Sequence, residues 1–175
     1  DVLGSRGLGD VYKRQVLYFG MNWLRDSSHR GGLGVFQQCE SLQAVPETLF
    51  AGCPLAEDMS YAFAGCKALT SLPDNLFRQN SRLEQVEGTF SSCTALTAIP
   101  AMLFDNNRKL MNVKSTFSGS LNVEGESPYT VIGNKKVHLY ERGDYPTEFV
   151  ALQEYVCCFE DCTKLTDCSD MPEYW

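Results

Sequence analysis

The chain has 175 residues, with 15 Lys plus Arg against 22 Asp plus Glu and a formal net charge of −7 at pH 7. An acidic surface repels phosphate backbones and anionic lipid, so we expect no nucleic acid partner and no binding to membrane surfaces. Hydrophobic residues make up 43% of the chain, which suffices for a core, and the absence of a run of about 18 apolar residues argues against direct membrane insertion.

Residues 1–15 differ from everything that follows them. The stretch SRGLGDVYKRQ (5–15) carries cations and glycines without an apolar period. Its last residues back-translate to GAT GTG TAT AAG AGA CAG, which resembles the end of the transposon adapters used to prepare sequencing libraries. We therefore expect residues 1–15 to be translated adapter, disordered and outside the fold. A natural disordered arm is the alternative, and residues 16–35 are expected to be a cap or sequence of equally foreign origin.

From residue 36 a period of 27 residues runs through the chain. Phenylalanine opens each unit, cysteine follows three residues later, and leucine follows three residues after that. The recurring positions are Phe36, Phe63, Phe90 and Phe117; Cys39, Cys66 and Cys93; and Leu42, Leu69 and Leu96. One such unit cannot bury its own apolar face, so we expect stacked units that share a ladder of like side chains over residues 36–120.

Within each unit the pattern predicts short strands that alternate with short helical turns. LTSLP (69–73) and LTAIP (96–100) end at a proline, which closes a strand and suits the first turn of a helix. We therefore expect an α/β solenoid with one coil per 27 residues. Two thinner coils per unit are the alternative, although 13 or 14 residues are few for a strand packed about 10 Å from a helix.

The cysteines that recur in register are expected to be small buried thiols. In the fourth unit Ser120 occupies their place, and a serine would not replace a disulfide partner. Some disulfide, or a metal site, is the alternative. The metal candidates are Cys157, Cys158, Cys162 and Cys168, of which the last two also fall on the repeat pattern.

The stretches FAGCKALTSLPDNLF (63–77) and FSSCTALTAIPAMLF (90–104) resemble the repeat pattern of BspA-like leucine-rich repeat proteins, which are abundant on the surface of gut Bacteroidetes. The resemblance covers 36–120 and a resumed, truncated repeat at 157–175. It implies a cell-surface or secreted protein whose export signal and anchor lie outside this fragment. It also implies a non-catalytic adhesion module that recognises a protein or a glycan. A structural spacer that presents another domain is the alternative.

Residues 121–156 are expected to form an insertion. YTVI (129–132) and KKVHLYE (135–141) flank Gly133-Asn134, which is a signal for a two-residue hairpin turn. Insertions in repeats often lie on a binding face, so the aromatic side chains of this segment are candidate contacts, with ordinary cross-strand packing as the alternative. These candidates are Tyr129, His138, Tyr140 and Tyr145.

Candidate catalytic residues are scarce, and we expect no catalytic site, no metal and no cofactor. The chain has only two histidines, so a cysteine enzyme, the remote alternative, would need His138 beside Cys157 or Cys158. No glycine-rich phosphate loop and no histidine metal spacing occur. The RGD triplet at 142–144 is a candidate integrin ligand, but Arg142 is expected in the second strand of the hairpin.

Overall fold

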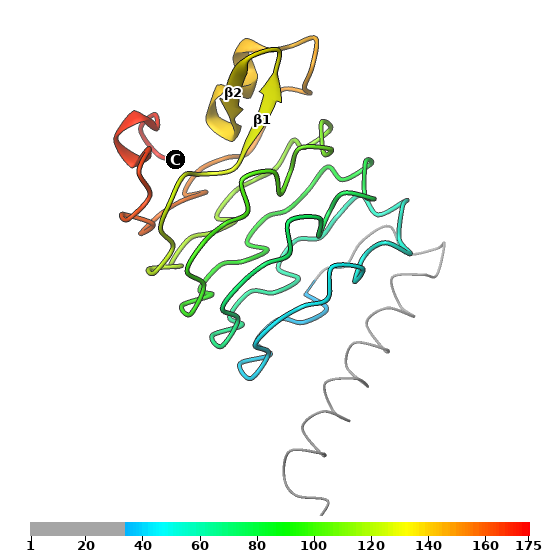
Figure 1. The fold of residues 1–175 in the computed structure, drawn as a ribbon, viewed down its shortest axis with the longest axis vertical. Helices are drawn as coiled ribbons and strands as arrows, with labels where there is room; N and C mark the ends of the chain where they lie inside the picture. The colour runs from blue at the N-terminus through cyan, green and yellow to red at the C-terminus, as the bar shows by residue number, and fades with distance from the viewer. Residues whose placement is uncertain (1–33) are drawn as a thin grey trace, which may run out of the picture.

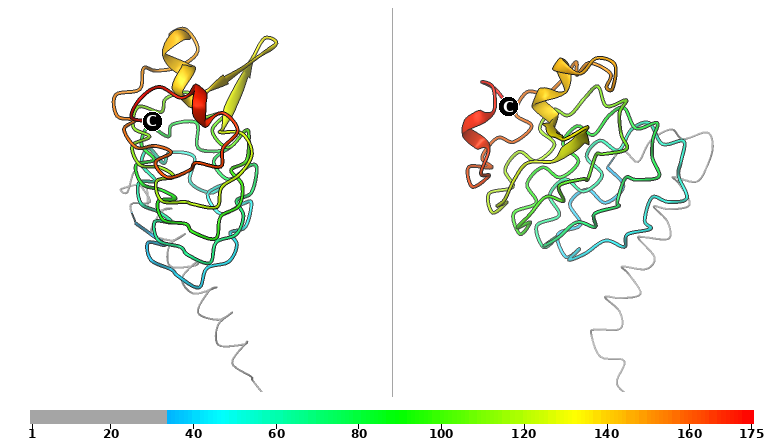
Figure 2. Two further views of the ribbon diagram at one scale, coloured as in Figure 1. Left: turned by 90° about the vertical axis from the view of Figure 1, so that its left-hand side faces the viewer. Right: turned by 45° about the horizontal axis from the view of Figure 1, so that its top comes forward.

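The computed structural model describes residues 34–175; the expected adapter (1–15) and residues 16–33 of the expected flank lie outside the described residues. From residue 36 the chain winds in successive turns that stack on one another (Figure 1). We call each turn a coil: coil 1 is 36–62, coil 2 is 63–89, coil 3 is 90–116, coil 4 begins at 117 and coil 5 at 159. A view turned by 90° shows these coils as stacked loops with the hairpin at one end (Figure 2).

Backbone hydrogen bonds join neighbouring coils at the same positions of the period. The amide of Phe36 donates to the carbonyl of Ala62 (2.8 Å), and the amide of Phe63 donates to the carbonyl of Thr89 (2.9 Å). On another side of the coils the direction reverses, since the amide of Thr70 donates back to the carbonyl of Gln43 (3.2 Å). Parallel β-bridges mark both sides: Asp58 with Gln85, Gln85 with Asn112, Asn112 with Glu154, Ala98 with Glu124, and Gly125 with Leu165.

The coils contain bridges and single turns where the sequence predicts short strands and short helices. In the described part of the chain, every regular strand or helix lies after residue 128. The segment 73–80, expected to be helical, forms hydrogen-bonded turns such as the one from the amide of Leu76 to the carbonyl of Pro73 (3.2 Å). Each coil changes direction every few residues, so its backbone groups pair with neighbouring coils before a longer element can form.

Each full coil turns through residues with left-handed backbone angles. Gly88 has φ +57, and Tyr61, at the same position one coil earlier, has φ 58. The Tyr61 ring also lies against Gly88, because a Cβ atom added to Gly88 would come within 2.5 Å of Tyr61 Cε1. Ser115, one coil later, has a similar angle (φ 51), so the space beside the Tyr61 ring, together with the angle, is what favours glycine at position 88.

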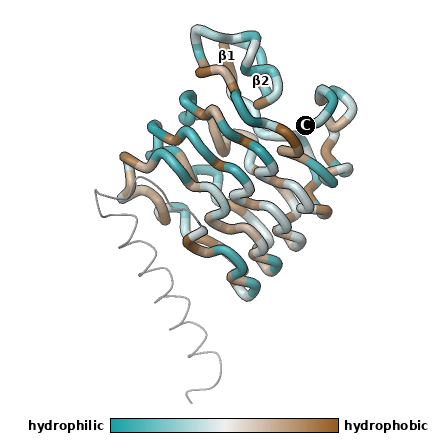
Figure 3. Tube along the Cα trace, turned by 180° about the vertical axis from the view of Figure 1, so that it is seen from behind, coloured by the Kyte–Doolittle hydropathy of each residue, from teal (hydrophilic) through white to brown (hydrophobic). Residues whose placement is uncertain are grey.

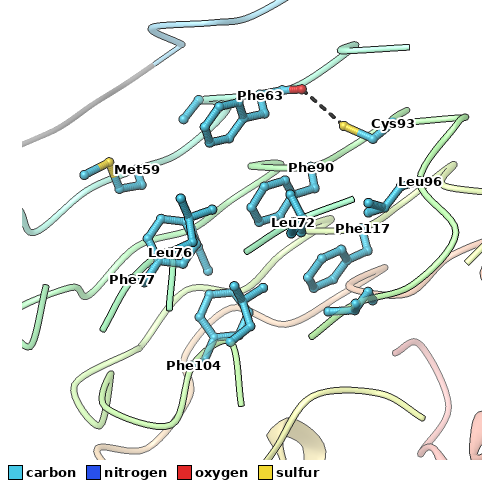
Figure 4. Packing of buried hydrophobic residues seen from close by; sticks show 14 of the residues in the cluster. Met59, Phe63, Leu72, Leu76, Phe77, Phe90, Cys93, Leu96, Phe104 and Phe117 are labelled. Atoms are coloured by element: carbon cyan, nitrogen blue, oxygen red, sulfur yellow. Dashed lines mark hydrogen bonds between the residues drawn. The ribbon is translucent and has the colours of Figure 1, made fainter. Parts of the chain in front are cut away.

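Two columns of phenylalanine rings form the centre of the stack. In the first column the centroid distances are 5.2 Å between Phe36 and Phe63, 5.5 Å between Phe63 and Phe90, and 5.4 Å between Phe90 and Phe117. The second column consists of Phe50, Phe77 and Phe104, spaced 5.7 Å apart. Figure 4 shows members of both columns with the leucines beside them, and Figure 3 shows apolar segments recurring along the coils. Each buried ring contributes roughly 1.5–3 kcal/mol through the hydrophobic effect.

The recurring cysteines lie against the phenylalanine column and donate hydrogen bonds. Cys66 Sγ donates to the carbonyl of Phe36 (3.1 Å), Cys93 Sγ to that of Phe63 (3.3 Å; Figure 4), and Ser120 Oγ to that of Phe90 (2.9 Å). Serine fits this position because it supplies the same single donor. Thiols that form no disulfide include those of Cys39, Cys66, Cys93, Cys157, Cys158, Cys162 and Cys168.

Buried asparagines join the coils at a second position. Asn80 Nδ2 donates to the carbonyls of Phe50 (3.1 Å) and Cys53 (2.7 Å). One coil later, Asn107 Nδ2 donates to the carbonyls of Phe77 (3.1 Å) and Asn80 (2.8 Å). Each amide thus gives a second hydrogen bond to two carbonyls of the preceding coil that already accept one within their own coil, as the carbonyl of Phe50 does from the amide of Cys53 (3.0 Å).

The insertion is a hairpin followed by a short helix. Strand β1 (Tyr129–Ile132) pairs antiparallel with β2 (Lys135–His138) across Gly133, which has φ 60, and Asn134. The 3-10 helix η1 (Leu139–Asp144) follows, and η2 (Cys168–Asp170) lies near the C-terminus (Figure 1). The expectation that the second strand includes Arg142 was wrong: β2 ends at His138, so Tyr140 and Arg142 are in η1.

The segment that leaves the coils is narrower than the expected 121–156. The amide of Glu124 still donates to the carbonyl of Thr97 (2.9 Å), and the amide of Tyr129 donates to that of Ala101 (2.8 Å). The pairing resumes where the amide of Val150 donates to the carbonyl of Arg108 (3.0 Å). Residues 121–129 and 150–156 therefore continue the coils on either side of the hairpin and η1.

Candidate binding surface

A buried polar cluster fixes the hairpin to the stack. Ser127, just before β1, donates from its amide to Asp167 Oδ1 (3.0 Å) and from Oγ to Oδ2 (2.5 Å). His138, at the end of β2, places Nδ1 2.9 Å from the same Oγ. Because the Ser127 hydroxyl has one proton, directed at Asp167, Nδ1 is the donor in its contact with Ser127. Three segments far apart in the sequence are held together in this way.

Acidic groups lie on both sides of the His138 ring. Nε2 is 3.3 Å from Glu126 Oε1, and Nδ1 is 3.4 Å from Asp167 Oδ2. The backbone amide of His138 also donates to Glu141 Oε2 (2.8 Å) at the start of η1. These contacts orient the imidazole and, with it, the junction between β2 and η1.

The cluster contains serine, histidine and aspartate, but its geometry is not that of a catalytic triad. In a triad the histidine lies between the other two and receives the serine proton. Here Ser127 gives its proton to Asp167, and the Ser127 side chain is 0% exposed. A substrate could not reach that hydroxyl, so the three residues hold the hairpin in place.

The two thiols that a cysteine enzyme would need here, Cys157 and Cys158, have raised pKa values. Burial raises the pKa of Cys158, and burial followed by the nearby Glu160 carboxylate raises the pKa of Cys157. A nucleophilic cysteine needs a lowered pKa, because the thiolate is the reactive form. The rings in contact with His138 are those of Tyr129 and Tyr140.

Among residues 34–175, no group of three His, Cys, Asp or Glu side chains could hold a metal ion.

Three of the four candidate contact residues come together. The His138 ring stacks on Tyr140 at 5.2 Å and meets Tyr129 edge-on at 5.5 Å. Lys136 Nζ lies 4.5 Å from the centroid of the Tyr129 ring, a favourable cation–π position. Trp175 meets the far side of Tyr140 at 6.0 Å. The hairpin and the last coil thus share one row of aromatic side chains.

The four candidates differ in what they can present to a ligand. Tyr129 and Tyr140 are half-buried. His138 is 7% exposed, and its imidazole holds the hairpin through Ser127. Burial, followed by the nearby Asp167 and Glu141 carboxylates, raises the pKa of Tyr140, so its hydroxyl stays protonated. Tyr145 follows η1 and closes a turn with its carbonyl, which accepts from the amide of Phe149 (3.1 Å). It takes no part in the ring contacts recorded for the other three.

Arg142 is a structural residue that sequence reasoning missed. Its Nη2 donates to the carbonyl of Phe104 (2.9 Å) and its Nη1 to that of Asn107 (3.1 Å). These carbonyls are equivalent to the pair that Asn107 itself satisfies one coil earlier. The guanidinium lies 4.5 Å from the Phe149 ring centroid, and burial lowers its pKa to about 9, so it remains charged at pH 7. With Arg142 2% exposed, the RGD triplet cannot present its arginine to an integrin.

A polar groove runs beside the base of the hairpin. It has a volume of about 750 Å³ and is formed by the same turn of coils 2 and 3. Residues that line it include Asp74, Asn75 and Arg78 from coil 2, and Ala101, Met102 and Asp105 from coil 3. The carbonyl of Ala101 accepts the first hydrogen bond of β1, from the amide of Tyr129, so groove and hairpin adjoin. The repeat pattern alone did not indicate this groove.

No protein-family model matches the chain, and no curated protein sequence matches it significantly. In the described residues, no helix has the length and apolar character needed to cross a bilayer.

Proposed function

We propose that this chain is part of a BspA-like leucine-rich repeat solenoid that acts at the cell surface, or after secretion, as a non-catalytic binding module. The ligand class is a protein or a glycan. The observation that carries the proposal is the combination of a repetitive scaffold with one ordered interruption. The hairpin leaves the stack after Tyr129, is fixed by buried hydrogen bonds from Ser127, and adjoins the polar groove of coils 2 and 3.

The physical basis for this role is preorganisation. A ligand that binds a loose loop must first order it, and this cost reduces affinity. Here Asp167 anchors one end of the hairpin and Arg142 anchors the helix that follows it. The exposed tip, with Val131 44% exposed and Lys135 beside it, is therefore held at a defined place relative to the coils.

A structural spacer is the second candidate. The stacked phenylalanine columns support it, because a stack of like coils transmits load and sets a distance without contacting any ligand. A spacer has no need for the surface side chains of the hairpin tip. Substitutions at the tip therefore separate the two roles.

The test is a binding screen with the whole 175-residue chain on arrays of purified extracellular-matrix proteins and of neutral and anionic oligosaccharides. We expect at least one ligand, and we expect its binding to fall about tenfold or more when Val131 and Lys135 are replaced by serine, the loss that follows removal of one good contact. Leu55→Ser, at a 56% exposed position of coil 1, is the control and should bind as the wild type does. Absence of any ligand from both arrays would favour the spacer.

A further inference from the structure

The groove is built from corresponding residues of two coils. Its lining residues fall into pairs 27 positions apart: Asp74 with Ala101, Asn75 with Met102, Arg78 with Asp105, and Gln79 with Asn106. The floor is therefore continuous from coil 2 to coil 3, and a ligand lying in it would cross the stack. A volume of about 750 Å³ is within the range of roughly 300–1,000 Å³ typical of small-ligand sites.

Hydrogen bonds within the groove hold several of its polar groups in place. Arg78 Nη1 donates to Asn75 Oδ1 (3.3 Å), and Asn75 Nδ2 donates to Glu47 Oε1 (2.6 Å). On the other coil, Asn106 Nδ2 donates to the carbonyl of Arg78 (2.8 Å). These contacts leave the exposed carboxylate of Asp74 as an acceptor and the remaining N–H groups of Arg78 as donors.

Such a mixture of donors and acceptors suits a ligand rich in hydroxyl groups. A hydroxyl donates one hydrogen bond and accepts others, so it can pair with the Asp74 carboxylate and with the Arg78 guanidinium. Met102, 42% exposed, and the half-buried Ala101 add a small apolar area against which the C–H face of a sugar ring could lie. The lining offers no large apolar surface for an anchoring aromatic or aliphatic side chain of a protein partner.

The charge of the groove selects among such ligands. Two carboxylates, Asp74 and Asp105, face one guanidinium, Arg78, which leaves an excess of one negative charge. The chain as a whole is acidic as well, with a net charge of −7. An anionic sugar polymer would meet repulsion both at a distance and on contact.

Resting on the binding role proposed above, we propose that this groove takes a neutral oligosaccharide, laid across coils 2 and 3 beside the base of the hairpin. Asp74 and Arg78 provide its polar contacts, and Met102 provides the apolar one.

The experiment measures binding of the whole chain to maltohexaose, cellohexaose, laminarihexaose and mannohexaose by calorimetry, with hexagalacturonate as the anionic counterpart. We expect at least one neutral hexasaccharide to bind and hexagalacturonate not to bind. Asp74→Ala removes an acceptor and should weaken the neutral ligand about tenfold, which corresponds to one lost hydrogen bond. Asp74→Lys changes the groove charge from −1 to +1 and should add measurable hexagalacturonate binding.

The control is Glu124→Lys, which makes the same charge change on an exposed residue that does not line the groove. It should leave all affinities within twofold of the wild type. Since the Asp74 side chain is exposed and makes no hydrogen bond within the described residues, its variants should unfold at the wild-type temperature, and circular dichroism checks this.

The outcomes separate this inference from the proposed function. Binding of a neutral hexasaccharide that neither Asp74 variant alters would overturn the groove as the site. Failure of every neutral hexasaccharide, with a matrix protein binding instead, would overturn the ligand class and leave the binding role intact. A chain that binds no hexasaccharide in calorimetry and nothing on the two arrays would contradict both.

Discussion

At the scale of single residues, the molecule depends on small donors repeated at fixed positions. A sulfhydryl or hydroxyl at the third position after the phenylalanine gives one carbonyl of the preceding coil a second hydrogen bond, as Cys93 does for Phe63 and Ser120 for Phe90. The chemical requirement is one donor in a small volume, which both cysteine and serine meet. Burial raises the pKa of Cys93 to about 12, so this thiol donates a hydrogen bond and does not act as a nucleophile.

Two substitutions at Cys93 test the contribution of its hydrogen-bond donor separately from that of its side-chain volume. Cys93→Ser keeps the donor and should cost under about 1 kcal/mol of unfolding free energy. Cys93→Ala removes the second hydrogen bond to the carbonyl of Phe63, which keeps the one from the amide of Cys66 (3.1 Å), and also removes the volume of the sulfur, so it should cost about 1–2 kcal/mol. Urea denaturation of the two variants and the wild type measures both values. Equal losses for serine and alanine would contradict the hydrogen-bonding role, and complete unfolding of Cys93→Ser would indicate a disulfide.

At the scale of elements, the insertion carries its own connection to the coils. Asn80 and Asn107 each satisfy two carbonyls of the coil before them, and the next coil would need a third asparagine. The residue 27 positions after Asn107 is Asn134, but it is exposed at the hairpin turn. Arg142 in η1 supplies the two donors instead. A guanidinium suits this place because its N–H groups are arranged in a rigid fork.

Removing this guanidinium should loosen the insertion. Arg142→Ala removes the charged donors to the carbonyls of Phe104 and Asn107, of which the first keeps the amide of Asn107 (3.1 Å), and should cost about 2–4 kcal/mol. Arg142→Lys should recover part of this loss, since an ammonium is a point donor and cannot match both carbonyls. Hydrogen exchange at residues 139–149, together with urea denaturation, reports both effects.

The matched control for that experiment is Arg108→Ala. Arg108 pairs with Glu148 at 2.7 Å, and both side chains are 40% exposed, so its loss should cost less than about 1 kcal/mol. A cost for Arg142→Ala no larger than that of the control would show that the carbonyls of coil 3 do not depend on Arg142.

At the scale of the whole molecule, stability is shared between neighbours along the stack. The Phe90 ring contacts Phe63 on one side, Phe117 on the other, and Phe77 of the second column. A change at this ring therefore weakens two interfaces between coils at once. In a linear array of this kind, the free energy of folding is the sum of the units and of the interfaces between them.

Phe90→Ala should cost roughly 3–5 kcal/mol, as expected for an aromatic side chain removed from a packed core. Thermal and urea unfolding measure the loss, and hydrogen exchange should show weaker protection on both sides of coil 3. Leu55→Ala, at an exposed position, is the control and should change stability by no more than about 0.5 kcal/mol. Near-wild-type melting of Phe90→Ala would contradict the stabilising role of the column.

The sequence by itself determined the period, because phenylalanine at 36, 63, 90 and 117 repeats at one interval. It also determined the turn at Gly133-Asn134, because that pair of residues has strong local conformational preferences. Only the tertiary structure decided what the interruption does. The roles of Arg142, Ser127 and Asp167 depend on contacts with residues 27 to 40 positions away, which no local pattern encodes. The groove has the same origin, since it exists only where corresponding turns of two coils lie side by side. Local preferences act within a few residues, whereas buried hydrogen bonds pair whichever groups packing brings together.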